Sequence, residues 1–380
     1  MVKSMFAAVA GLRTHQARMD VIGNNIANVN TYGFKKARAT FRDQFYQTLS
    51  GASEAGNVYG GRNPSQVGYG VLMSSVDVNY GTGSGAPTGW GTDVMIAGNG
   101  FFVVGQYNAN GVDRVSNSLA EVGNLTQLNL TRVGIFDFDG SGNFVDSMGN
   151  YVYGFLYNSA YGEGGLYDPA ATGDFEYSPD RLEMLHVPQV LMRTNGTAVL
   201  DINGNFIPIP YETNAGVYVT DDYGQKILDW GAISDILDEL DEEFVLPEEA
   251  TETEPATVYN AAMKLNNISV GADGLVRGTN DLGQVVRIGI IAVANVPNPN
   301  ALVNIGNGYY KAESNTGVVT GEHPGEGSTG QLNAGYLEMA NVDLAQEFTD
   351  MITTQRGFQA NGRIITVTDE MLAELVNLKR

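Results

Sequence analysis

The side chains best suited to catalysis or metal binding are few in this sequence and lie far apart. Its three histidines are His15, His186 and His323, and no metal-ligand spacing links them. The chain has no cysteine, which excludes disulfides, thiolate metal sites and cysteine nucleophiles. Nothing in the sequence singles out two of its 43 acidic residues as a glycosidase pair. We therefore predict no catalytic, cofactor or metal site.

The segment Asp137–Gly142 begins like the calcium-binding loop of an EF-hand. Asp137, Asp139 and Ser141 would occupy the first, third and fifth positions of that loop. The twelfth position, where a bidentate Glu is required, is Met148. A turn that joins two strands is therefore predicted here.

Several short segments between residues 71 and 335 have the texture of β-strands. Residues 71–78 and 285–293 are rich in β-branched side chains and are predicted strands. Residues 93–96 and 101–104 flank Gly98-Asn99-Gly100, which predicts a hairpin. With 48 glycines in the chain, these segments indicate a β-rich, loop-rich body.

The two ends of the chain carry a different pattern, in which apolar residues recur every seven positions. This spacing predicts two amphipathic helices that pair as in a coiled coil. One is expected over the first thirty residues, with Gly33 as a left-handed cap, and the other from Asn341, its N-cap, to the end. The predicted apolar seam, which we expect to be the subunit-assembly surface, consists of Met5, Leu12, Met19, Ile22, Ile26, Leu337, Leu344, Phe348, Met351, Phe358, Ile365 and Leu372.

The net charge of −22 argues against nucleic-acid binding, which needs clustered Lys and Arg. No run of eighteen apolar residues is present, so membrane insertion is not expected. Residues 235–254 contain ten acidic residues and no basic ones. Such a run is typical of a solvated surface.

Both ends of the chain resemble the signatures of flagellar rod and hook proteins, a family of axial subunits. The β segments next to the two chain ends match the family as well. With them, the resemblance covers roughly the first 155 and the last 110 residues. The matching residues at the ends include Asn24, Asn25, Asn28, Gly33 and Phe34, and then Asn341, Asp343, Gln355, Arg356, Gln359 and Asn361.

The resemblance implies a mixed fold, in which N- and C-terminal helices pair in a coiled-coil-like inner domain and the middle and outer domains are mainly β. The inner domain would comprise 1–32 and 336–380, and 33–70 would be an extended linker. Residues 71–155 and 266–335 would form the β-rich middle domain. Residues 156–265, including the acidic segment 235–254, would be an inserted β-rich outer domain.

The resemblance also implies a structural subunit, not an enzyme, that polymerises into a helical tube. The long central region favours the flagellar hook, which transmits torque from rod to filament and encloses the export channel. Expected partners are further copies of the chain, the distal rod, hook cap and hook–filament junction proteins, and the flagellar export apparatus. The protein would be extracellular, in the hook and basal body, and exported without a cleaved signal peptide.

Two alternatives remain open at this point. The first is a long distal-rod protein of the same family. The second is of a different class, an acidic β-rich surface module that binds glycans, which would leave the two helical ends unexplained.

The acidic segment 235–254 generates a first prediction. Burying so many carboxylates in a subunit contact would be costly, so the segment should lie away from the assembly surface. Replacing it with a short Gly/Ser linker should leave polymerisation intact, as observed by electron microscopy. Loss of polymers from a chain that still folds would contradict this.

Overall fold

The computed structural model describes residues 2–52, 54, 60–106, 112–113, 128–156, 181–193, 213–214, 217–218 and 258–378. The chain divides into two compact units. Unit 1 comprises Met1–Gly81 and Ala340–Arg380, and unit 2 comprises Thr82–Met339. The acidic segment 235–254 lies outside the described residues, as does most of the expected outer domain.

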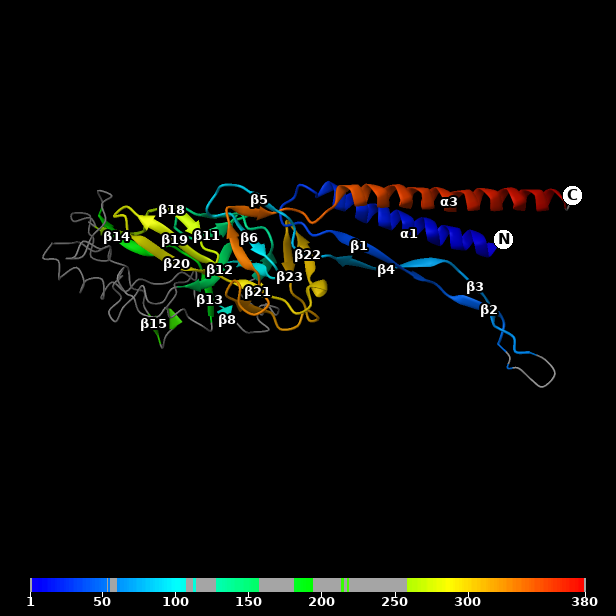
Figure 1. Ribbon diagram of the computed structural model, residues 1–380, viewed down its shortest axis with the longest axis horizontal. Helices are drawn as coiled ribbons and strands as arrows, with labels where there is room; N and C mark the ends of the chain where they lie inside the picture. The colour runs from blue at the N-terminus through cyan, green and yellow to red at the C-terminus, as the bar shows by residue number, and fades with distance from the viewer. Residues whose placement is uncertain are drawn as a thin grey trace, which may run out of the picture. The chain divides into compact units, whose positions relative to one another are not determined.

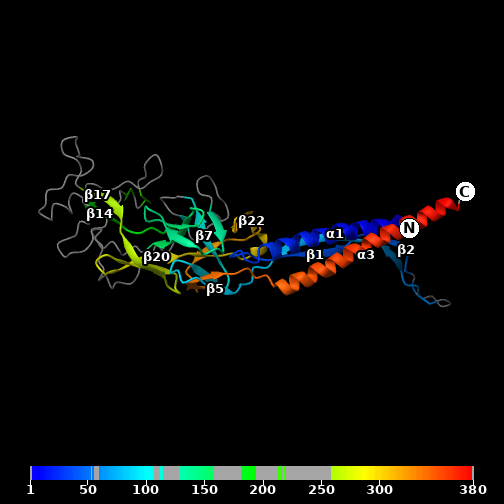
Figure 2. The same cartoon turned by 90° about the horizontal axis from the view of Figure 1, so that it is seen from above.

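Unit 1 is built on the two terminal helices, α1 (Val2–Ala27) and α3 (Leu344–Asn377). They lie side by side and antiparallel, with the two chain ends at the same end of the pair (Figures 1 and 2). The mixed fold class, with terminal helices and a mainly β middle, is thus confirmed.

The expected caps of these helices differ from those observed. Asp343, not Asn341, caps α3, and its carboxylate accepts hydrogen bonds from the backbone of the first turn. Asn341 instead bridges three backbone groups, because its amide accepts from Lys36 N and donates to the carbonyl oxygens of Asn79 and Gly81. Gly33 is left-handed (φ 70°) but lies beyond the helix, in the turns that follow Ala27.

The segment after α1 is not a plain linker. It forms two antiparallel pairs, which we call the ribbon: β1 (Ala37–Asp43) with β4 (Val71–Val78), and β2 (Tyr46–Ser50) with β3 (Ser65–Gly68). Because β4 pairs with β1, residues 71–81 belong to unit 1, and the expected boundary at residue 70 moves to Gly81.

Unit 2 is a β structure whose main antiparallel path runs β18-β19-β20-β12-β7-β9-β23-β22. The strands lying off this path pair at its sides or in separate two-stranded sheets. The described strands are β5 (Gly85–Pro87), β6 (Val94–Ala97), β7 (Phe101–Gly105), β8 (Val112–Asp113), β9 (Leu128–Thr131), β10 (Phe136–Phe138), β11 (Phe144–Asp146), β12 (Tyr151–Leu156), β13 (Arg181–Met184), β14 (Gln189–Arg193), β15 (Thr213–Asn214), β16 (Val217–Tyr218), β17 (Val258–Ala262), β18 (Leu265–Val270), β19 (Leu275–Asn280), β20 (Val285–Ile291), β21 (Val293–Asn295), β22 (Val303–Gly306), β23 (Tyr309–Lys311), β24 (Thr320–Glu322), β25 (Gln331–Ala334) and β26 (Tyr336–Glu338), with a 3-10 turn, η3 (Pro299–Ala301).

The core of unit 2 gathers aromatic and β-branched side chains from strands far apart in sequence. Phe102 packs edge-on against Phe136 with ring centroids 5.0 Å apart, and Phe136 contacts Phe144 at 5.3 Å. Val104 and Ile291 are fully buried beside them. Burial of this apolar surface is the dominant force that holds such a domain together.

The predicted hairpin over residues 93–104 is wrong. β6 pairs with β25, whereas β7 pairs with β9, β12 and β21. Gly98 and Gly100 have φ of 135° and 121°, and a Cβ on Gly98 would lie 2.9 Å from the Cα of Gly330. The glycines therefore carry the chain from one sheet to another through a narrow gap.

The turn predicted at Asp137–Gly142 is confirmed, since β10 and β11 pair on either side of it. One oxygen of Asp139 accepts from the backbone N–H groups of Ser141 and Asn143, at 2.9 and 2.7 Å. The other oxygen accepts from the amide of Asn143. The carboxylate that suggested calcium binding thus stabilises the turn itself.

Leu337 corrects the predicted apolar seam. It lies in β26, opposite Ala86 of β5, and is 4% exposed within unit 2. Its spacing to Leu344 is seven residues, but the chain turns between them and α3 starts only at Leu344. Leu337 is therefore a core residue of the β unit.

Next to Leu337, Glu338 forms a buried ion pair with Arg132, and the two side chains are 0% and 1% exposed. The guanidinium donates to Glu338 at 3.2 Å and to the carbonyl oxygen of Gly98 at 2.9 Å. Glu338 also accepts from the backbone N–H of Gly83. Burial lowers the pKa of Arg132, which the neighbouring carboxylate opposes, and burial raises the pKa of Tyr310 beside them to about 12. Tyr310 thus stays neutral against the pair.

This ion pair generates a second prediction. Arg132→Met removes the cation beside the buried carboxylate of Glu338, which should cost about 3–5 kcal/mol of the free energy of unfolding. The double variant Arg132→Met/Glu338→Leu removes both charges and should recover much of that loss. Calorimetric unfolding of the full chain measures both. Equal destabilisation by the single and double variants would contradict the ion-pair account.

Candidate assembly surface

The two terminal helices contact each other through small and polar side chains. On α3 the residues that face α1 recur every seven positions, as Glu347, Thr354, Asn361 and Thr368. Glu347, Thr354 and Thr368 are 6%, 2% and 2% exposed. We call these four residues the polar seam.

Asn25 ties the polar seam to the rest of unit 1. It is 1% exposed, and its amide donates to Glu347 at 3.2 Å. The same side chain donates to Ala37 O at 2.9 Å and accepts from Ala37 N at 3.0 Å. One side chain of α1 thus bonds to α3 and to the first residue of β1, which fixes the register of all three elements.

Further contacts continue the pairing along both helices. Arg18 and Asp350 form a partly exposed ion pair at 3.2 Å. Gly11 lies against Asn361, whose amide nitrogen would be 2.6 Å from a Cβ at that glycine. These positions follow the order of an antiparallel pair and let the backbones approach closely.

His15 is also in this contact. Its ring lies where a Cβ on Gly357 of α3 would be, 2.8 Å away, and edge-on to Phe41 of β1 with centroids 6.4 Å apart. The other two histidines lie in unit 2, where His186 Nδ1 is 3.1 Å from Met184 O and His323 stacks on Phe155.

The helical members of the predicted apolar seam alternate with the polar seam and are partly covered in the single chain. Ile22 is buried, at 4% exposed, but Leu344, Phe348 and Phe358 are 40%, 50% and 36% exposed. The other helical members, Met5, Leu12, Met19, Ile26, Met351, Ile365 and Leu372, are half-buried. The helical part of the apolar seam therefore runs alongside the polar seam, and its role as the subunit-assembly surface stays a prediction.

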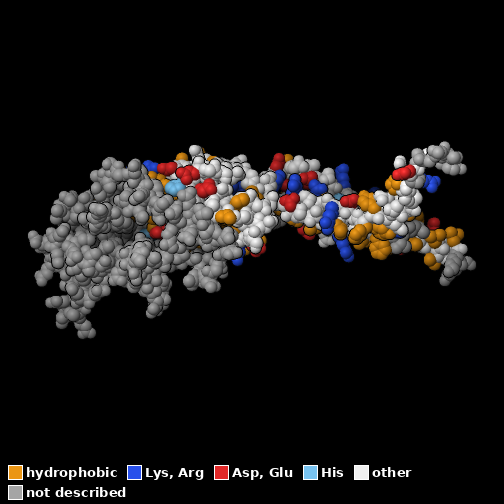
Figure 3. Space-filling view, turned by 90° about the horizontal axis from the view of Figure 1, so that it is seen from below, with side chains coloured by type: hydrophobic (Ala, Val, Ile, Leu, Met, Phe, Trp, Pro, Cys, Tyr) orange, Lys and Arg blue, Asp and Glu red, His pale blue; other side chains and the backbone are white. Residues whose placement is uncertain are grey.

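Apolar side chains remain uncovered on α3. Ile352, Ile364, Val367, Met371 and Leu375 are 50%, 44%, 52%, 43% and 48% exposed. On the face of unit 1 seen in Figure 3, hydrophobic side chains gather beside Lys and Arg side chains. Extended apolar patches of this kind mark interaction surfaces in soluble proteins.

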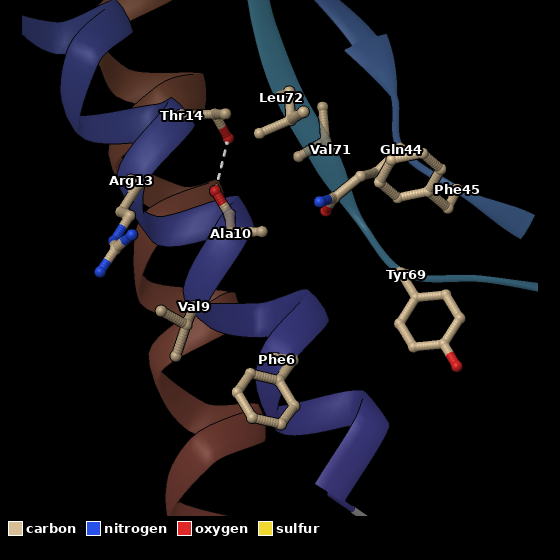
Figure 4. Close-up of a pocket in the computed structure, with 10 residues that line it drawn as sticks. All are labelled: Phe6, Val9, Ala10, Arg13, Thr14, Gln44, Phe45, Tyr69, Val71 and Leu72. Carbon is tan, nitrogen blue, oxygen red and sulfur yellow. Dashed lines mark hydrogen bonds between the residues drawn. The ribbon is translucent and has the colours of Figure 1, made fainter.

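A second apolar feature is a groove of 490 Å³ between α1 and the ribbon. Figure 4 shows its walls. They consist of Phe6, Val9, Ala10, Arg13 and Thr14 on α1, and of Gln44, Phe45, Tyr69, Val71 and Leu72 on the ribbon.

The residues of the family motif take several places in unit 1. Asn25, Asn341 and Asp343 make the buried and capping bonds described above. Asn28 donates to the backbone and side-chain oxygens of Asn24 at the end of α1. Gly33 is buried and Phe34 half-buried, whereas Gln355, Arg356 and Gln359 are exposed on α3 and Asn361 is half-buried.

Sequence reasoning missed the polar seam itself. The hydrophobic pattern does not place Glu347, Thr354 and Thr368 in the contact between α1 and α3, although they repeat with the same period of seven as the apolar residues beside them. That shared period, read without regard to polarity, is the signal that could have found them.

Among the described residues no cluster of three or more acidic or histidine side chains could hold a metal ion. Within the same residues no helix is long and apolar enough to cross a membrane. Unit 1 presents a pair of helices with exposed apolar side chains.

Two family models match the ends of the chain. One is described as "Flagellar basal body rod FlgEFG protein C-terminal" and matches residues 333–378, and the other as "Flagella basal body rod protein" and matches residues 5–35. Over 100% of both chains, the sequence is 31% identical to the flagellar basal-body rod protein FlgG of Bacillus subtilis. It is 29% identical to the flagellar hook protein FlgE of Borreliella burgdorferi, again over 100% of both chains.

A further relative is the flagellar hook protein FlgE of Escherichia coli, 26% identical over 98% of this chain and 99% of that one. Among solved structures, the Helicobacter pylori flagellar hook protein FlgE2 aligns with 67% of this chain and 100% of its own, at 11% identity and a TM-score of 0.38.

The third prediction compares alanine substitutions at two glycines of α3, one inside the contact with α1 and one outside it. A Cβ at Gly357 meets the ring of His15, whereas a Cβ at Gly362 meets nothing within 4 Å. Gly357→Ala should therefore weaken the pairing of α1 with α3. Gly362→Ala, the matched control, should stabilise α3 by up to ~1 kcal/mol, since glycine costs that much in a helix. Hydrogen exchange of α1 and α3 measures both, and the account fails if the two variants behave alike.

Proposed function

This chain belongs to the family of flagellar rod and hook proteins, and we propose that, as a structural subunit of the flagellar hook, it polymerises through the apolar side chains that α1 and α3 leave exposed. This proposal is supported by the exposure of apolar side chains such as Ile352, Val367 and Leu375 on α3, although α3 is paired with α1.

Assembly would bury apolar side chains that are exposed to water in the single chain. Each large apolar side chain removed from water contributes about 1.5–3 kcal/mol. Phe348, Ile352 and Val367 are each at least half exposed in the single chain, and burial against other copies would recover that free energy. A helix with an uncovered apolar face is also marginal in water, so assembly and ordering of the helices should be coupled.

Within the family, the relatives named as hook proteins support the hook over the rod. The Bacillus subtilis relative that is named as a rod protein also aligns over its full length. A long central region is therefore not by itself diagnostic of the hook. The two functions differ in mechanics, because a hook bends while it rotates and a rod does not.

The finer parts of the proposal concern partners and location. We expect the tube to begin on the distal rod, to grow beneath a hook cap and to end at hook–filament junction proteins, after export of the chain without signal cleavage. Polar side chains such as Gln355 and Gln359 are exposed on α3 and suit a wet channel wall. In this role the protein needs no catalytic residue, and we propose that it is not an enzyme.

Electron microscopy of the purified, polymerised chain tests the function directly. A hook subunit should give curved, flexible tubes. Straight, stiff tubes would favour the rod, and a chain that stays monomeric while binding glycans would favour a surface module.

The fourth prediction concerns Met351 and Phe358, which lie beside the polar seam on α3. Changing either to Asp places a carboxylate in the proposed subunit contact, where an unpaired charge costs several kcal/mol. Because every subunit repeats the defect, the variant should form no tubes, although the thermal transition of unit 2 should match that of the wild type.

Two control variants show whether loss of tubes depends on where on α3 the added charge lies and on whether the side chain is apolar. Gln359→Asp adds the same charge at an exposed polar site, and Phe358→Leu keeps an apolar side chain, so both should still polymerise. Normal tubes from Phe358→Asp would show that this face is not the assembly surface. Unfolding of unit 2 would show that α3 belongs to its core.

A further inference from the structure

The groove between α1 and the ribbon is open to solvent although its walls are largely apolar. Phe6, Phe45 and Leu72 are 60%, 77% and 40% exposed. The groove has a volume of 490 Å³. The ribbon comes close to α1 at Gly70, where a Cβ would be 3.2 Å from the Cβ of Ala10.

We propose that this groove receives the C-terminal part of α3, residues 364–378, from a second copy of the chain. The inference rests on the proposed function, since it names one contact of the polymer. Ile364, Val367, Met371 and Leu375 are spaced by three or four residues and therefore share one face of the helix. That spacing is the pattern by which an amphipathic helix fills an apolar groove.

The α3 of the same chain is not the occupant. It packs on the face of α1 that carries Gly11, His15 and Asn25, whereas Phe6, Val9 and Arg13 lie on the other side of α1. In unit 1, α1 thus lies between its own α3 and the groove. An α3 that fills the groove must come from another copy.

Charge favours the same pairing. Residues 364–378 carry Asp369, Glu370 and Glu374 and no basic residue. The first nineteen residues carry Lys3, Arg13 and Arg18 and no acidic residue. Arg13 lines the groove, and the ammonium of Lys3 lies over the ring of Tyr69, 5.5 Å from its centroid. The acidic side chains of this segment, which lies between Arg363 and Lys379, are therefore drawn to the basic margin of the groove.

Site-directed cross-linking tests the contact without background, because the chain has no cysteine. A Leu72→Cys copy and a size-tagged Met371→Cys copy are polymerised together and oxidised. A disulfide forms only when the two Cα atoms lie within about 7 Å, so a mixed dimer on a non-reducing gel is expected. Thr366→Cys, on the opposite face of α3, is the matched control and should give no mixed dimer.

A second pair of variants tests the charge. Arg13→Glu in the Leu72→Cys copy should lower the yield of the mixed dimer, and Glu374→Arg in the Met371→Cys copy should restore it. Polymers that form normally but give no Met371 cross-link, or that cross-link Thr366 equally well, overturn this inference and leave the proposed function standing. A wild-type chain that never polymerises contradicts the proposed function, and this inference with it.

Discussion

The pairing of α1 with α3 through small and polar side chains is the constraint on which the rest of unit 1 depends. Asn25 bonds to Glu347 on α3 and to both backbone groups of Ala37, so that one buried amide holds two helices and a strand in register. Polar residues at such positions specify register at a cost in stability. Apolar side chains such as Ile352, Val367 and Leu375 are left exposed on α3, where other copies can cover them.

In each unit, hydrogen bonds also join the two chain segments at which the chain passes from one unit to the other. In unit 1, Asn341 bonds to the backbone of residues 36, 79 and 81, and the ammonium of Lys35 donates to Gly81 O. In unit 2, the carboxylate of Glu338 binds Gly83 N and the guanidinium of Arg132. Each of the two connecting segments is therefore hydrogen-bonded to the other within its own unit.

The sequence predicted the two helices well because their period of seven is long and regular. It did not predict which residues make the helix contact, because Thr354 and Thr368 give no hydrophobic signal. It also placed Leu337 in the apolar seam, because Leu337 has the right spacing although it lies in a strand. The hairpin over residues 93–104 failed for a related reason. Strand partners such as β25 come from more than two hundred residues away, and local turn chemistry at Gly98 and Gly100 cannot reveal them.

We propose that the helices of one chain pair by the polar seam and assemble with other copies by their exposed apolar side chains. A reconstruction of the polymer by electron cryomicroscopy, at a resolution that shows side chains, would reveal both contacts. Thr354 and Thr368 should face α1 of their own chain, and Val367 and Met371 should be buried against another copy. An α3 whose apolar residues line the open channel, or whose polar seam faces a different copy, would contradict it.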